Sequence, residues 1–123
     1  MLDAKFREIL ETEGAATFTT MGKAGPHMAA TWNSYIRIIG TDELLVPAGS
    51  LYETEQNIEN GSDVQMIVAS KEIQGTHGYG AGFLLKGRAV FETNGTRFDQ
   101  IKSDFPWARA VMVLRLQEVK QLI

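Results

Sequence analysis

The sequence contains no cysteine and only two histidines among its 123 residues. Without cysteine the chain has no disulfide scaffold, iron–sulfur cluster, cysteine-ligated zinc or thiol nucleophile. The two histidines, His27 and His77, lie far apart in the chain, and neither has a carboxylate at helical spacing beside it. We therefore expect no metal site.

Positive charge and long apolar runs are also scarce. Twelve basic side chains against fifteen acidic ones give a net charge of −3, which argues against a nucleic-acid-binding surface. No stretch approaches the roughly 20 apolar residues of a membrane-spanning helix, and the N-terminal residues mix charges instead of forming an apolar signal core. We expect a cytoplasmic protein with no nucleic-acid partner and no membrane partner.

The alternation of β-forming residues and turn signals predicts a mainly β protein with one core and a single domain over residues 1–123. A closed or half-closed antiparallel barrel is favoured over an open sheet. Short helices are expected after an Asp3 cap, from Leu51 to Asn60 and from Thr96 to Phe105. The glycine-rich segment 74–81 is expected to be a loop at the barrel mouth. About six strands are expected, at residues 15–20, 27–39, 43–47, 64–70, 82–91 and 110–116.

The segment Thr31-Trp32-Asn33-Ser34-Tyr35 is unusually polar and aromatic for a strand in a dry core. Its hydroxyls and amide are suited to orienting a polar ligand, and its two aromatic rings offer flat apolar faces. The same residue types also occur on half-exposed edge strands. Spacing alone leaves both interpretations open.

Four segments together, Thr31–Tyr35, Val46–Gly49, Thr54–Asn57 and Trp107–Ala110, resemble the small bacterial FMN-binding proteins of sulfate reducers. The resemblance extends across nearly the whole chain. It implies a split β-barrel of the pyridoxamine 5′-phosphate oxidase-like superfamily, with about six antiparallel strands in a Greek-key arrangement and short peripheral helices. It further implies a homodimer with one non-covalent FMN per subunit near the interface.

The resemblance also implies the residues that surround the flavin. Polar contacts fall on Thr31, Asn33 and Ser34, and aromatic neighbours of the ring on Trp32, Tyr35 and Trp107. The backbone of Pro47, Ala48 and Gly49 lies near the ring edge, while Leu122 reaches it from the partner subunit. Ser50, Thr54 and Asn57 are the candidates for holding the phosphate.

Two features of this chain need a structural answer. Strict alternation would place Trp32 and Tyr35 on opposite faces, so the strand must bulge, end or twist between them if both contact the ring. Glu53 stands where the resembling family has a lysine suited to the flavin phosphate. Either Glu53 points to solvent, or Lys86, Arg88 or Arg109 supplies the cation, or binding is weaker.

The leading functional hypothesis is electron transfer through bound FMN with an unidentified redox partner. One alternative is an FMN-dependent oxidoreductase resembling pyridoxamine 5′-phosphate oxidase or a flavin reductase, acting on a small-molecule substrate. Another is a non-redox module that binds FMN or a different planar cofactor such as haem. No residue stands out as catalytic.

Overall fold

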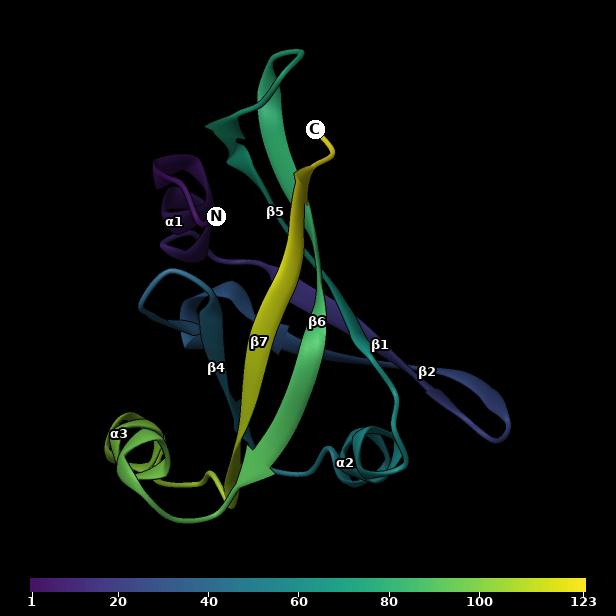
Figure 1. Cartoon of the computed structure of the whole chain (residues 1–123). Coiled ribbons are helices and arrows are strands. Elements are labelled where there is room, and N and C mark those ends of the chain that lie inside the picture. Colours follow the sequence, from purple (N-terminus) through teal and green to yellow (C-terminus); the bar gives the residue numbers. More distant parts are fainter.

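The computed structural model describes residues 1–123 as one seven-stranded antiparallel sheet with three short helices (Figure 1). The strands are hydrogen-bonded in the order β2-β1-β5-β6-β7-β4-β3, so β2 and β3 are the two edges. The mainly β split-barrel prediction is confirmed, with seven strands in place of about six. The elements in chain order are α1 (Ala4–Leu10), β1 (Ala15–Gly22), β2 (Gly25–Trp32), the 3-10 turn η1 (Asn33–Tyr35), β3 (Arg37–Ile39), β4 (Glu43–Ala48), α2 (Tyr52–Glu59), β5 (Val64–Gln74), β6 (Tyr79–Glu92), α3 (Thr96–Asp104) and β7 (Ala110–Gln121).

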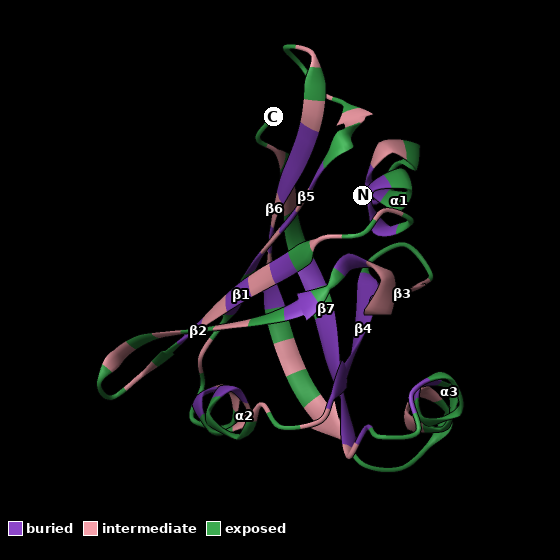
Figure 2. Ribbon diagram, turned by 180° about the vertical axis from the view of Figure 1, so that it is seen from behind, coloured by how far each residue is buried: buried purple, intermediate pink, exposed green.

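The sheet curls around one apolar core of 18 buried residues. Phe18 of β1 and Leu44 of β4 both belong to this core, although β1 and β4 are separated by three strands in the sheet order. Helix α1 packs on the core through Phe6, whose ring lies 5.7 Å from that of Phe83 in an edge-to-face arrangement. Figure 2 shows the buried residues running along β4, β6 and β7.

A second, smaller core lies outside the barrel. It joins Ile101 of α3 to Leu45 of β4 and to Val111 and Val113 of β7. Helices α2 and α3 both lie at the end of the molecule opposite the C-terminus (Figure 1). None of the helices has the length and apolar character needed to cross a membrane.

The single strand expected over residues 27–39 is wrong, because β2 ends at Trp32 and β3 begins at Arg37. Two hydrogen bonds pull Asn33 out of the strand: its backbone N–H donates to Gly14 O at 2.8 Å and its side-chain Nδ2 donates to Ala69 O at 3.0 Å. The irregularity predicted between Trp32 and Tyr35 is confirmed as the turn η1.

The loop expected over residues 74–81 is also wrong, because β5 and β6 extend into it and only residues 75–78 separate them. Gln74 pairs with Tyr79 across the hairpin, and Gly75 N donates to Gly78 O at 2.6 Å. Strand β7 likewise continues to Gln121 instead of ending at Leu116. The pairing of β6 with β7 shifts register at Lys86/Gly87.

Candidate functional site

A cleft of about 220 Å³ lies where the ends of β2 and β4 approach each other without hydrogen bonding. The two strands can be followed in Figure 2, where the end of β2 lies beside β4. None of the side chains that line the cleft is charged. The nine lining residues are Ala30, Thr31, Trp32, Tyr35, Pro47, Gly49, Ser50, Leu51 and Trp107.

Aromatic side chains form one wall of this cleft. The turn η1 brings Tyr35 against Trp107, with ring centroids 5.8 Å apart, and Phe105 packs behind both at 4.9 Å and 5.7 Å. Gly49 leaves room for the Trp107 ring beside its backbone, because a Cβ added at Gly49 would lie 3.3 Å from Trp107 Cε3. Trp32 and Trp107 nevertheless remain 51% and 52% exposed. Exposed indole faces beside a cleft favour covering by a planar apolar ligand or another chain.

Two predicted site residues are fully buried and each has an oxygen with no hydrogen-bond partner. One is Asn33, whose Oδ1 is unpartnered although its Nδ2 is bonded to Ala69 O. The other is Thr54 in the first turn of α2, whose Oγ1 has no partner. Burying a polar atom without a partner costs roughly 1–3 kcal/mol. A buried polar atom without a protein partner calls for another partner, such as a water, an ion or a ligand.

Asn33 and Thr54 do not line the cleft, and neither do three other predicted residues, Ser34, Ala48 and Asn57. The carbonyl of Ser34 accepts from Arg37 Nη1 at 2.7 Å, and Ala48 is buried within the β4–β7 pairing. Asn57 Nδ2 donates to Thr20 Oγ1 at 3.1 Å, which fixes α2 on β1. The structure thus gives Asn57 a role in positioning the helix.

Leu122 lies beyond the far end of β7, where its N–H donates to Gly82 O at 2.8 Å. Trp107 precedes Ala110, the first residue of β7, by three positions at the other end of the strand. Twelve residues of strand separate the two, roughly 35–40 Å along β7. Leu122 therefore cannot reach the cleft of its own chain, and it is 46% exposed.

Arg109 directly precedes β7, and its side chain packs against the beginning of α2, next to the cleft. Its Nη2 donates to Ser50 O at 2.7 Å and to Glu55 Oε1 at 2.8 Å, and its guanidinium lies 4.0 Å from the centre of the Tyr52 ring. Among the three cations considered from the sequence, Arg109 is the one that bonds to a cleft-lining residue. Its long-range contacts to residues 50–55 left no local signal in the sequence.

The first turn of α2 begins without a side-chain cap. Leu51 precedes the helix in the left-handed conformation with φ 61°, an uncommon state for a residue with a Cβ. The N–H groups of the first turn therefore receive no side-chain acceptor. The sequence did not predict the left-handed conformation of Leu51.

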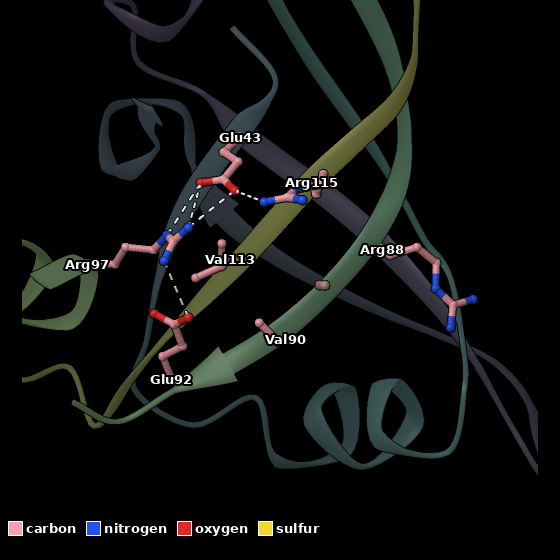
Figure 3. A pocket seen from close by; sticks show the side chains of 8 residues that line it. Glu43, Arg88, Val90, Glu92, Arg97, Val113 and Arg115 are labelled. Carbon is pink, nitrogen blue, oxygen red and sulfur yellow. Dashed lines mark hydrogen bonds and ion pairs between the residues drawn. The ribbon is translucent and has the colours of Figure 1, made fainter. Parts of the chain in front are cut away.

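A second cavity, of about 320 Å³, lies on the outer face of β6, β7 and β4 (Figure 3). Glu43 at its rim is 8% exposed at the side chain and accepts from Arg115 at 2.6 Å and from Arg97 at 3.2 Å. The hydrogen bond from Arg115 lowers the pKa of Glu43, with further lowering by Arg97 and opposition from burial.

The charges around this second cavity pair with one another. Arg97 also approaches Glu92 at 3.7 Å (Figure 3). Arg88 pairs with Asp63, which does not line the cavity, at 2.5 Å. Because Arg97 belongs to α3 and Glu43 to β4, the cluster fastens the helix to the sheet. Its arrangement is that of a structural clamp.

No protein-family model matches the chain. The FMN-binding protein of Nitratidesulfovibrio vulgaris strain Miyazaki F is 37% identical over 123 residues, which are 100% of both chains. Among solved structures, HupZ of group A Streptococcus superposes with a TM-score of 0.82 at 16% identity, covering 99% of this chain and 94% of HupZ. An FMN-binding protein of Syntrophomonas wolfei superposes with a TM-score of 0.69 at 17% identity, covering 95% and 88%.

Proposed function

The chain belongs to the FMN-binding protein family, within the pyridoxamine 5′-phosphate oxidase-like split barrels. On that premise we propose that the chain binds FMN in the β2–β4 cleft and transfers electrons through the bound FMN. The observation that carries the proposal is the uncharged cleft with half-exposed Trp32 and Trp107. Flat aromatic faces and neutral hydrogen-bonding groups suit a planar heteroaromatic ring.

The beginning of α2 fits the phosphate end of the cofactor. The N–H groups of its first turn have no side-chain acceptor, and the buried hydroxyl of Thr54 has no partner. A helix N-terminus favours an anion through its N–H groups and its dipole. Arg109 beside Ser50 lies at the same end, where it is paired with Glu55 at 2.8 Å. Thr54, the α2 backbone and Arg109 would therefore hold the phosphate.

A second copy of the chain would complete the site. Ligand pockets for molecules of this size usually enclose about 300–1,000 Å³. The cleft of one chain encloses about 220 Å³ and leaves both indoles half exposed. We therefore include a homodimer in the proposal, with the tail at Leu122 of each copy covering the ring bound to the other.

The cleft favours electron transfer over substrate turnover. FMN supplies the redox chemistry when bound, and the chain binds it, orients it and excludes water. None of the nine cleft-lining side chains is an Asp, Glu, His or Lys, so Tyr35 is the one general acid or base of the usual types among them. Its packing against Phe105 and Trp107 makes Tyr35 part of the aromatic wall. Electrons can pass through this uncharged wall to a redox partner without an acid–base group.

The binding proposal is tested by titrating the apoprotein with FMN and following the quenching of flavin fluorescence. Replacing Trp32 or Trp107 by Leu should raise the dissociation constant roughly tenfold, because each loses a stacking face. Tyr79→Leu is the matched control, since this aromatic is 81% exposed and lies outside the cleft. An apoprotein that takes up no FMN would overturn the proposal.

The electron-transfer proposal needs a separate assay on the holoprotein. We expect the reduced holoprotein to pass electrons to a one-electron acceptor protein such as a cytochrome, and to show no turnover of pyridoxamine 5′-phosphate or NAD(P)H in the presence of oxygen. Sustained turnover of either substrate would replace this proposal by the enzyme alternative. A holoprotein that neither turns over nor exchanges electrons would favour the non-redox alternative.

A further inference from the structure

Glu53 belongs to the same first turn of α2 as Thr54, where the proposed function places the FMN phosphate. An acidic side chain in the first turn of a helix stabilises the helix through the dipole. The same position sets a negative charge beside a dianionic phosphate, and the two anions repel each other. The direction in which Glu53 points therefore affects how well the phosphate binds.

The structure turns Glu53 away from the cleft. The cleft lining includes Ser50 and Leu51 but not Glu53. Glu53 lines a separate hollow of about 270 Å³ beneath the β1–β2 hairpin, together with residues 22–26. The carboxylate thus faces the β1–β2 hairpin and not the cleft.

His27 holds Glu53 in this direction. His27 Nδ1 lies 2.5 Å from Glu53 Oε2, an ion-pair contact when the imidazole is protonated. His27 belongs to β2, opposite Thr20 of β1. The contact therefore joins the beginning of α2 to the hairpin.

This contact is not what fixes the helix. One turn further along α2, Asn57 donates to Thr20 in a buried hydrogen bond, and beyond the helix Ser62 Oγ accepts from Met21 N. Glu53 itself is 65% exposed at the side chain, and exposed pairs of this kind add little to stability. Removing His27 should free the carboxylate while the helix stays in place.

We propose that His27 is a positioning residue for FMN: it holds the Glu53 carboxylate away from the phosphate end of the cleft without contacting the cofactor. The inference rests on the proposed function. Its consequence is selective, since riboflavin has the same ring as FMN but lacks the phosphate. Loss of His27 should weaken FMN binding and leave riboflavin binding unchanged.

The test is a double-mutant cycle on the apoprotein, with dissociation constants for FMN and riboflavin measured at one pH and low salt. His27→Ala should raise the dissociation constant for FMN roughly three- to tenfold, a range set by partly screened repulsion, with no change for riboflavin. The same substitution in a Glu53→Gln chain should have no effect, because the repelling charge is absent. His77→Ala, in the exposed β5–β6 hairpin, is the control.

Two results would overturn the inference while leaving the proposed function intact. One is an equal loss of FMN and riboflavin affinity in His27→Ala, which would indicate a general structural role. The other is a loss of FMN affinity that persists in the Glu53→Gln chain. Unfolding temperatures of all variants, expected within about 2 °C of one another, check that the chains fold. A native apoprotein that binds neither flavin would overturn both proposals.

Discussion

Replacing Thr54 by Val should make the apoprotein more stable and the FMN complex weaker. Thr54 is fully buried, and its hydroxyl has no hydrogen-bond partner. Valine keeps the branched shape and replaces the hydroxyl by a methyl group, so the unpaired polar atom disappears and packing is retained. Opposite effects on stability and on binding are the signature of a polar atom placed for a ligand.

The magnitudes follow from the burial. An unpartnered buried hydroxyl costs roughly 1–3 kcal/mol, so a gain of about 1 kcal/mol in the free energy of unfolding is the conservative expectation. With an unfolding entropy of about 2.1 cal/mol/K per residue, a chain of 123 residues has about 0.26 kcal/mol/K, and the gain raises Tm by about 4 °C. Loss of a hydrogen bond to charged phosphate, about 1.5–3 kcal/mol, raises the FMN dissociation constant roughly 10- to 150-fold.

Calorimetry of the apoprotein and fluorescence titration with FMN measure the two effects. Thr20→Val is the matched control, because Thr20 is equally buried but its hydroxyl accepts from Asn57. That variant should lose about 1–2 kcal/mol of stability. A Thr54→Val apoprotein that is less stable than the native chain, or that binds FMN equally well, would refute the reasoning.

Three further predictions concern the charge clamp, the phosphate end and the tail. Glu43→Gln should lower stability by about 1–2 kcal/mol at neutral pH. Because the hydrogen bond from Arg115 lowers the pKa of Glu43 in the folded chain, the contribution of Glu43 is complete above the pKa of a free Glu and is lost as the pH falls through the folded-state pKa. Thermal melts of the two proteins should therefore converge on acidification, and a constant gap would contradict this. Glu53→Lys should tighten FMN binding roughly tenfold in fluorescence titration, and unchanged or weaker affinity would show that residue 53 does not act on the phosphate. Deleting residues 122–123 should shift the dimer towards monomer in sedimentation experiments and weaken FMN binding, whereas an unaltered dimer with native affinity would exclude the tail from the interface.

The sequence was most informative where structure depends on neighbours in the chain. The Asp3 cap is confirmed by the bond from Phe6 N to Asp3 Oδ1 at 2.9 Å, and the helices α2 and α3 end within a residue or two of their predicted limits. Strands were located by alternation, which is a local pattern. Their ends were less accurate, because hairpin pairing extends β5 and β6 beyond the residues that alternate.

The candidate site was predicted in part for the same reason. The conflict between strand alternation and the shared role that the resemblance implies for Trp32 and Tyr35 predicted an irregularity between them, and the structure places it at Asn33. The bond that makes the break, from Asn33 to Ala69, joins residues 36 positions apart and has no local signature. The contact between His27 and Glu53 and the Glu43 clamp likewise arise only once the sheet order is known. Local patterns therefore identified residue types, and the fold decided their partners.

In the proposed dimer, the length of β7 would couple dimerisation to FMN binding. One end of the strand leads from the cleft and the other carries the tail, so in the proposed dimer each chain would cover the cofactor of the other. Binding and association would then be linked equilibria, each strengthening the other by the same factor. Dilution would release the flavin as well as separate the subunits, and a chain lacking cofactor would dimerise less tightly. Holoprotein concentration would in that case regulate how much of the protein is redox-active.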